Sequence, residues 1–453
     1  MTECFSQQSV FFHQKRRVDV VCNAPEISSD GGVLLLRMVD DHLGLSKILA
    51  RAIPDDRAPA RIKHSRDEQV RQRLYQIALG YEDCNDAERL RYDPLLKTAC
   101  NRLPDDTEGL SSQPTLSRFE NAVSMKAIKR MLLDFEEAYV LSLSKRRKLI
   151  VLDIDTTDDE THGRQQLTFF HGYYDQHMYH PQLVFDQDGN LITAILRPGN
   201  THAARGAKGV LNRLIRAIRK RCPHAEIVVR ADSGFGVPRI YELLEQLDRE
   251  LGKVEYIIGI AKNSILKEKA KRLMARAAAC CEKTQAPARF YGAIHYAAKT
   301  WSRKRRVIVK AEHTLLGPNP RFVVTSYTTK ELRADDGYHT YCGRGQCENF
   351  IKDLKNAMKA DRLSCSSFVA NFFRLILHAA AYRLMFELRE ELAIERIDMG
   401  NCQLDTLRMR LLKVGAMVRQ SVRRILIQMP EAFPLADAFL AICARLSPSS
   451  GVP

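Results

Sequence analysis

The sequence predicts an α/β protein built around one mixed sheet, with helices on the faces of the sheet and a helical segment before it. Two observations lead to this prediction. The pattern of apolar residues changes abruptly from helical spacing to short apolar runs where KLIVLDID begins at residue 148. The elements expected from there onward are a strand, an antiparallel hairpin, a helix, a strand, a helix and a strand. Because this order departs from strict β–α alternation, we expect both parallel and antiparallel neighbours.

The individual elements follow from local patterns. Before residue 141, apolar residues keep helical spacing in segments such as RDEQVRQRLYQIALGYED, and prolines separate these segments. Buried strands are expected in the apolar runs KLIVLDID, AEIVVRAD and VEYIIGIA. DQDGN marks the turn of the hairpin between two further runs. The helices expected between these strands are AKGVLNRLIRAIRKRC and PRIYELLEQL.

Beyond the last of these strands the composition becomes basic. We expect a helix in SILKEKAKRLMARAAA, followed by twisted basic strands. The next helix is expected to start near Gln346. Two long amphipathic helices are then expected, in SFVANFFRLILHAAAYRLMFELREEL and in LDTLRMRLLKVGAMVRQSVRRILIQM. Their apolar faces suit packing against the sheet.

Composition and charge narrow the class of protein. The 453 residues are 45% hydrophobic, which suits a globular chain, and their formal net charge is +16 at pH 7. Such a surplus of lysine and arginine favours a polyanionic partner, either nucleic acid or an anionic membrane. No run of roughly eighteen apolar residues is present, so we expect no membrane span. The N-terminus lacks the layout of a signal peptide, which favours a cytoplasmic protein.

Three acidic residues stand where α/β proteins place their sites. Asp155 and Asp232 each end a predicted strand, and Glu348 lies on the helix after the basic segment. Taken singly, an aspartate after a strand often only caps the next turn, and a glutamate on a basic helix often only forms a surface salt bridge. Three converging carboxylates would repel one another unless a cation compensates. Mg²⁺ prefers such oxygen ligands, and pairs of Mg²⁺ ions serve phosphodiester chemistry.

Basic and aromatic residues around Glu348 suit a nucleic-acid backbone. YCGRGQCENFIKDLK contains Tyr341, Arg344, Lys352 and Lys355 beside the glutamate. Arginine offers a bidentate fork to phosphate and lysine offers a point charge. Trp301 lies in the basic stretch KTWSRKRR, where it would stack on an unpaired base or pack in a half-buried position. No glycine-rich loop has phosphate-binding spacing, so we expect no nucleotide cofactor.

These acidic residues carry a resemblance to a known family. In their order, Asp155, Asp232 and Glu348 resemble the Asp-Asp-Glu (DDE) triad of the transposases of bacterial insertion sequences, whose catalytic core has the ribonuclease H-like fold. The neighbourhoods DTT and RADSGFG are similar to those of the two aspartates of the family. Asp153 shares the face of Asp155 on the strand. The resemblance favours Asp155 as the metal ligand, since the aspartate of the family directly precedes two threonines. Asp153 would then lie behind the ligands and support them.

A second motif makes the resemblance more specific. The signature Tyr-x-x-Arg-x-x-x-Glu-x-x-x-x-x-x-Lys of the insertion-sequence-4-like group is matched at every fixed position, by Tyr341, Arg344, Glu348 and Lys355. GYEDCNDAERLRYDP and SSQPTLSRFEN are similar to the insertion-sequence-1380 branch. The family also implies a β-rich insertion between the second aspartate and the glutamate, in agreement with the basic strands expected there.

The resemblance implies a cut-and-paste DNA transposase that binds two Mg²⁺ ions through its triad, with Mn²⁺ as a substitute. Its partners would be double-stranded DNA, as terminal inverted repeats and target, and a second copy in a homodimer on DNA near the bacterial nucleoid. Two alternatives stay open, namely a structure-selective ribonuclease H-like nuclease and a non-catalytic DNA-binding repressor derived from a transposase. The expected regions are 1–140 for DNA-end binding or dimerisation, 141–261 for the first part of the core, 262–338 for the β-rich insertion, 339–395 for the catalytic-helix part of the core and 396–453 for a helical C-terminal region.

Overall fold

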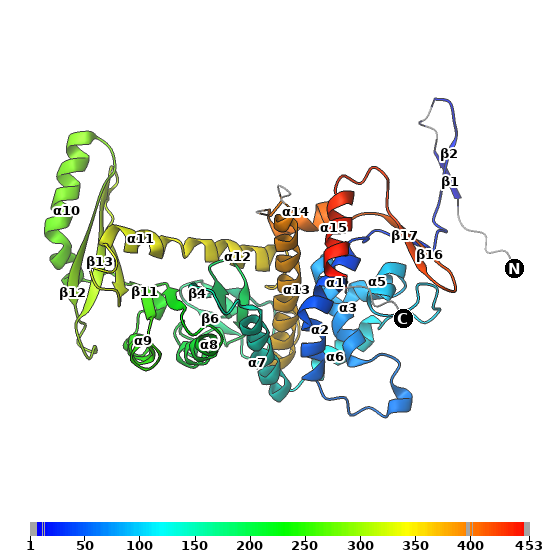
Figure 1. Cartoon of the computed structure of the whole chain (residues 1–453), viewed down its shortest axis with the longest axis horizontal. Coiled ribbons are helices and arrows are strands. Elements are labelled where there is room, and N and C mark those ends of the chain that lie inside the picture. Colours follow the sequence, from blue (N-terminus) through cyan, green and yellow to red (C-terminus); the bar gives the residue numbers. More distant parts are fainter. Residues whose placement is uncertain (1–6, 11, 13, 396–398, 401, 448–453) are drawn as a thin grey trace.

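The computed structural model describes residues 7–447 except 11, 13, 396–398 and 401. Figure 1 shows an elongated molecule in which the sheet and its extension occupy one half and a helical region occupies the other, with α13 between them. Within the described residues no helix is both long and apolar enough to cross a membrane.

The strands form one large sheet and three small ones. The large sheet has the order β12-β13-β15-β11-β10-β4-β8-β9, and β14 pairs with β13 at its side. Their bounds are Leu149–Thr156 for β4, Gln182–Asp186 for β8, Leu191–Ile195 for β9, Glu226–Ala231 for β10, Val254–Ile260 for β11, Ala288–Tyr296 for β12, Arg305–Thr314 for β13, Gly317–Pro318 for β14 and Arg321–Thr325 for β15. The small sheets contain β1 Gln7–Val10 and β2 Val18–Val21; β3 Ile27–Ser28, β16 Ala416–Gln420 and β17 Ile425–Gln428; and β5 Asp159–Glu160, β6 Phe169–His171 and β7 Gln176–Tyr179.

The helices surround the large sheet and build the other half of the molecule. Those of the helical half are α1 Val33–Leu43, α2 Leu45–Arg51, α3 Arg66–Leu79, α4 Ala87–Leu90, α5 Pro94–Ala99, α6 Gln113–Asn121, α7 Met125–Ser142, α14 Leu404–Leu407 and α15 Ala436–Leu446. Those next to the sheet are α8 Ala207–Arg221, α9 Pro238–Leu251, α10 Ser264–Thr284, α11 Ala334–Cys342, α12 Gly345–Asn356 and α13 Phe368–Ile394.

The predicted mixed sheet is confirmed. Strands β4, β10 and β11 are parallel neighbours, whereas on the other side of β4 strand β8 pairs antiparallel with β4 and β9 pairs antiparallel with β8. The core strands in chain order are β4, β8, β9, β10 and β11. Across the sheet they lie in the order β9-β8-β4-β10-β11, that is 3-2-1-4-5, which is the ribonuclease H-like order. The segment between β11 and α11 contributes α10 and then strands that continue the same sheet, because β15 pairs with β11.

Alternation along the core strands separates the two faces of the sheet. On β4, Ile150 and Leu152 belong to the hydrophobic cluster that packs under α8 and α9. Val151 belongs to a smaller cluster beneath α11, together with Val228 of β10. Side chains at positions of the same parity as Val151 therefore point toward α11 and α12. These two helices run end to end across that face toward α13 (Figure 1).

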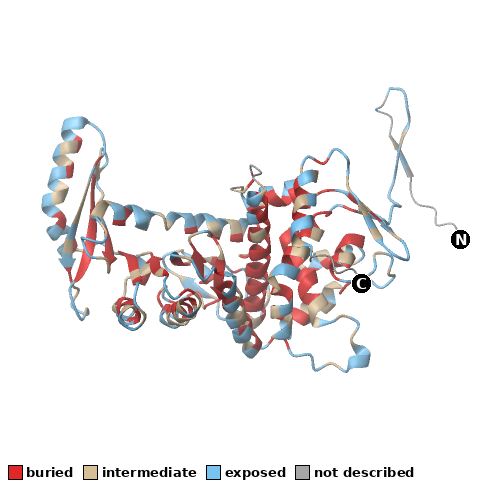
Figure 2. Ribbon diagram, in the orientation of Figure 1, coloured by how far each residue is buried: buried red, intermediate tan, exposed pale blue. Residues whose placement is uncertain are grey.

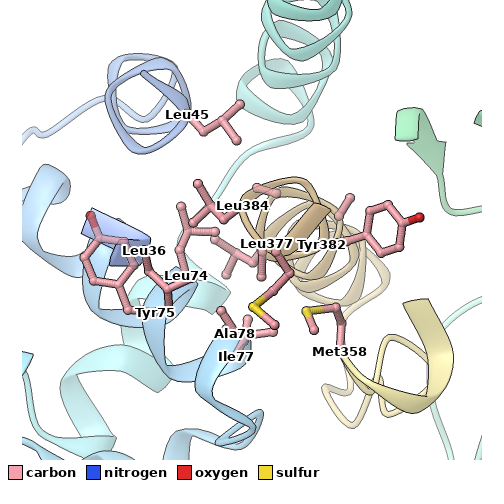
Figure 3. Close-up of a cluster of buried hydrophobic side chains, with 14 of the residues drawn as sticks. Leu36, Leu45, Leu74, Tyr75, Ile77, Ala78, Met358, Leu377, Tyr382 and Leu384 are labelled. Carbon is pink, nitrogen blue, oxygen red and sulfur yellow. The ribbon is translucent and has the colours of Figure 1, made fainter. Parts of the chain in front are cut away.

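Helix α13 is the hydrophobic centre of the molecule. It is buried around nearly its whole circumference, as the red ribbon in Figure 2 shows, because the N-terminal helices cover one side and the sheet covers the other. Leu377 and Leu384 of α13 meet Leu36 of α1 and Leu74 of α3, and Met358 approaches from the segment after α12 (Figure 3). The helical half is thereby fixed to the sheet through one shared core.

The prediction of a long helix in LDTLRMRLLKVGAMVRQSVRRILIQM is wrong. The segment forms the short α14, a π-helical turn over Arg408–Leu412, and then the hairpin of β16 and β17. Strand β16 also pairs with β3 from the N-terminal region. A Cβ at Gly32 would lie 2.4 Å from the Cα of Leu412, so glycine is needed for this close approach. Pairing with a distant strand thus overrides the local helical spacing, and 396–453 contains strands as well as helices.

A buried histidine couples the core to pH. His378 on α13 is fully buried, and its Nδ1 donates a hydrogen bond to the carbonyl of Met358 at 2.5 Å. Burial lowers the pKa of His378 to about 3, and the charges of Arg374 and Arg73 act in the same direction. The folded protein therefore holds this ring neutral at pH values where an unfolded chain would protonate it.

We expect the His378→Gln variant to lose less stability in acid than the native protein. Because the folded pKa lies below the unfolded value, the unfolded chain binds more protons, and stability falls as the pH drops below about 6.5. At about pH 4.5 this contribution amounts to about 2–3 kcal/mol. Urea unfolding at about pH 4.5 and 7 measures it, and His224→Gln, at an exposed histidine, is the control. If His378→Gln and His224→Gln lost equal stability between about pH 7 and 4.5, the pH dependence could not be assigned to His378.

Candidate functional site

The predicted aspartates meet at one edge of the sheet. Strands β4 and β10 are parallel, and their register pairs Asp153 with Arg230 and Ile154 with Ala231. The next residues along the two strands are Asp155 and Asp232. By alternation both lie on the face that α11 and α12 cover. This edge is where the carboxyl ends of parallel strands meet, the usual position of a site in such sheets.

Asp155 is a buried carboxylate with few partners. Its side chain accepts a hydrogen bond from the backbone N–H of Thr156 at 2.8 Å and another from Nη1 of Arg344 at 2.6 Å. Burial raises the pKa of Asp155 to about 6. The Arg344 guanidinium opposes this shift, whereas the charges of Asp232 and Glu348 add to it. The charges of the other two predicted carboxylates are therefore felt at Asp155.

Asp232 has the ordinary structural role that an aspartate after a strand can have. It caps a short 3₁₀ turn, Ser233–Phe235, by accepting a hydrogen bond from the backbone N–H of Gly234 at 2.9 Å. The side chain is partly exposed at the edge of the sheet. One carboxylate oxygen serves the turn, and the cap therefore does not exclude a second role for the group.

Glu348 is linked to Asp155 by the side chain of Arg344, which contacts both carboxylates. It lies in the first turn of α12, its side chain is 59% exposed, and its Oε1 is 3.5 Å from Nη2 of Arg344. The same guanidinium bonds Asp155, so the cation between the strands and the helix is Arg344. Among the residues that the structure describes, no three acidic, histidine or cysteine side chains are arranged to hold a metal ion.

A second arginine fixes the helix junction to the sheet. Arg230 on β10 forms two hydrogen bonds to the buried carboxylate of Asp153, at 2.7 and 2.6 Å, and donates a third to the carbonyl of Thr340 on α11 at 3.0 Å. A Cβ at Gly343 would lie 2.4 Å from Nη1 of Arg230, so a larger residue at this junction would require the guanidinium to shift. Sequence reasoning missed Arg230, although an arginine inside the buried strand AEIVVRAD was a usable signal.

Tyr341 is held between α11 and the sheet. Its hydroxyl would lie 2.7 Å from a Cβ at Gly259 of β11, and its ring neighbours that of Tyr338 with centroids 6.0 Å apart. Burial raises the pKa of Tyr341, and Arg344 opposes that shift. The tyrosine therefore supports the junction and lies beside Arg344.

The two predicted lysines differ in their surroundings. Lys355 donates from Nζ to the backbone and side-chain oxygens of Asp158, both at 3.1 Å. Burial alone would raise the pKa of Asp158, but the Lys355 ammonium and hydrogen bonds to the carboxylate together lower it. Lys352 is exposed and borders a groove of about 670 Å³ between α12 and α13, which Asp353 also lines.

Trp301 lies away from the carboxylates. It packs against the hydrophobic cluster on the α8 and α9 face of the sheet, opposite to α12. Its ring lies 5.1 Å from that of Tyr241 and 5.3 Å from that of Tyr296, and the Arg305 guanidinium lies 5.2 Å from its centroid. The structure thus brings the acidic residues, Tyr341, Arg344 and Lys355 to one face and leaves Trp301 on the other.

The order and direction of the core strands define a ribonuclease H-like α/β protein. The chain belongs to the family described as transposase DDE domain group 1, whose profile matches residues 11–450. The predicted DDE transposase family is thereby confirmed. Among solved structures, a chain of a piggyBac transposase synaptic complex with hairpin DNA, determined by cryo-electron microscopy, is similar at 10% identity and a TM-score of 0.45, over 94% of this chain and 87% of that chain. No curated protein matches the chain.

We expect the Arg230→Leu variant to lose about 3–5 kcal/mol of stability, because it leaves the Asp153 carboxylate buried without a partner. The double variant Asp153→Leu, Arg230→Leu should recover most of this loss, since no unpaired charge remains. Urea unfolding measures both. The control is Arg333→Leu, which removes an exposed pair with Asp335 and should leave the stability almost unchanged. A double variant as unstable as the single one would contradict this role of the pair.

Proposed function

We propose that the protein is a cut-and-paste DNA transposase that cleaves the ends of its own element and joins them to target DNA. The observation that carries the proposal is the group of Asp155, Asp232 and Glu348 around Arg344 at the carboxyl ends of two parallel strands. The family supports a polynucleotidyl transferase or nuclease. The formal net charge of +16 supports DNA as the substrate.

The chemical type of these donors suits divalent cations, although among the described residues Arg344, and not an arranged set of three ligands, links Asp155 and Glu348. Three carboxylates are the ligands that Mg²⁺ prefers, with Mn²⁺ as a substitute, and the raised pKa of Asp155 reflects a buried group that lacks sufficient positive charge nearby. When bound, two such ions activate the attacking oxygen and stabilise the leaving oxygen of a phosphodiester. In our proposal Asp155 and Asp232 supply ligands from the sheet, and Glu348 supplies one from α12.

Arg344 links substrate binding to the carboxylates. Its guanidinium now bonds Asp155 at 2.6 Å and lies 3.5 Å from Glu348. A DNA phosphate is an alternative bidentate partner for arginine. Transfer of Arg344 to a phosphate would free both carboxylates for cations at the moment when DNA arrives. Lys355 would act in the same way by exchanging Asp158 for phosphate, since its pair is partly exposed.

The finer assignment within the family is also part of the proposal. Tyr341, Arg344, Glu348 and Lys355 keep the spacing of the insertion-sequence-4-like group, and other stretches support the insertion-sequence-1380 branch. Lys352, exposed beside them on α12, would add a phosphate contact. Two element ends must be joined in one reaction, which supports a homodimer on DNA. The helical region 1–140 would then bind the terminal inverted repeats or the second copy.

The alternatives differ in their chemistry. A structure-selective nuclease on the same fold would cleave DNA without joining the freed 3′-hydroxyl to a target. A repressor derived from a transposase would bind the element ends without cleaving them. Strand joining therefore separates the proposed function from both.

We expect Glu348→Gln to reduce cleavage and strand transfer at least about a hundredfold, because it removes a charged cation ligand and cation catalysis supplies several kcal/mol. The substrate is a labelled duplex from the DNA that flanks the coding sequence, incubated with Mg²⁺ and a target plasmid. DNA binding should persist, since the change adds no repulsion toward phosphate. Glu268→Gln, at an exposed glutamate of α10, is the matched control. Undiminished strand transfer in Glu348→Gln would overturn the mechanism.

We expect Arg344→Ala to bind Mn²⁺ several-fold more tightly than the native protein when DNA is absent, because the variant lacks the guanidinium that competes for Asp155 and Glu348. The same variant should bind DNA more weakly and show a shallower dependence of affinity on salt. Isothermal titration calorimetry measures the affinity for Mn²⁺, and fluorescence anisotropy measures the affinity for DNA and its dependence on salt. Arg333→Ala, at an exposed arginine, should change neither. Weaker Mn²⁺ binding by Arg344→Ala would contradict this competition.

A further inference from the structure

An exposed aromatic hairpin lies beside the candidate site. Strands β6 and β7 form a hairpin within the small sheet β5-β7-β6, which follows β4 in the chain. In the described part of the chain five phenylalanine, tyrosine or tryptophan side chains are exposed, and three of them, Phe169, Phe170 and Tyr173, belong to this hairpin. Tyr173 at the tip is 85% exposed. Such a concentration of exposed rings indicates a binding surface.

The base of the hairpin is bonded to the carboxylate site. Gln176 on β7 donates from Nε2 to Asp158 at 3.2 Å, and Asp158 in turn pairs with Lys355 of α12. Near the tip, Tyr174 is partly buried, and its pKa is raised to about 12 by burial and by the nearby charges of Asp158, Asp155 and Asp232. The hairpin therefore borders the edge of the sheet where Asp155 and Asp232 lie.

The tip is supported from below by packed rings. Tyr173 contacts Tyr174 edge to face with centroids 5.0 Å apart, and Tyr174 lies 5.2 Å from His171 and 6.0 Å from His180. Nδ1 of the buried His180 hydrogen-bonds the carbonyl of Thr201 at 2.8 Å. Above this support the surface is open, because a Cβ at Gly172 would meet no atom within 4 Å. A planar group thus has access to the Tyr173 ring.

We propose that Tyr173 and Phe170 form a stacking platform for DNA bases that become unpaired next to the cleaved phosphodiester. Every base has a flat face that stacks on an aromatic ring, so such a platform tolerates any sequence. Trp301 cannot serve this position from the opposite face of the sheet. The inference rests on the proposed function, because DNA must lie over Asp155 for its bases to reach the hairpin.

The test compares two DNA probes in the presence of EDTA, so that no cleavage occurs. One probe is a duplex with a three-nucleotide bulge that contains 2-aminopurine, and the other is the same sequence fully paired. The native protein should bind the bulged duplex about tenfold more tightly, the effect of about one stacked base, and quench its fluorescence. Tyr173→Ala combined with Phe170→Ala should abolish both the preference and the quenching.

Matched variants separate stacking from folding. Tyr173→Phe retains the ring and should behave as the native protein does. Leu316→Ala removes an exposed apolar side chain outside the hairpin and should also keep the preference. An unchanged preference in the double alanine variant, or no preference in the native protein, would overturn the platform. The Glu348→Gln cleavage assay is independent of this binding assay, so failure of the platform is distinguishable from failure of the proposed transposase.

Discussion

The site depends on two arginine–aspartate pairs that join the sheet to the helices crossing it. Carboxylates buried on a β-sheet are costly unless a cation compensates them. Arg230 compensates Asp153 from the neighbouring strand and also bonds α11, whereas Arg344 compensates Asp155 from the start of α12. The position of α12, and with it that of Glu348, follows from these pairs and from Gly343, which permits the close approach.

The two ion pairs differ in how readily they can exchange partners. The pair of Arg230 and Asp153 is almost fully buried, so it belongs to the structural core of the sheet. Arg344 lies at the edge of the sheet within reach of more negative charge than it can neutralise, from Asp155, Asp232 and Glu348. Such an excess of negative charge is suited to further cations, and an incoming phosphate suits the arginine. The same local charges thus support both cation binding by the carboxylates and phosphate binding by Arg344 in the proposed chemistry.

The faces of the sheet decide which aromatic residues can take part. Trp301 and Tyr173 both lie in segments with polar or basic neighbours, and the sequence left Trp301 two roles, stacking on an unpaired base or packing in a half-buried position. In the structure the tryptophan packs with Tyr241 and Tyr296 on the face away from α12. Tyr173 lies on a short hairpin that local patterns did not indicate, because its strands are brief and its small sheet is completed by β5.

The sequence by itself determined the core strands, the hairpin around DQDGN, the family motifs and the aspartates at strand ends, since each depends on patterns within a few residues. Only the tertiary structure decided that β15 extends the core sheet, that Arg230 bonds Asp153 and Thr340, and that β16 pairs with β3 where a helix was expected. Those features join residues far apart in the chain. Their free energy comes from contacts that exist only after folding, which local propensity cannot report.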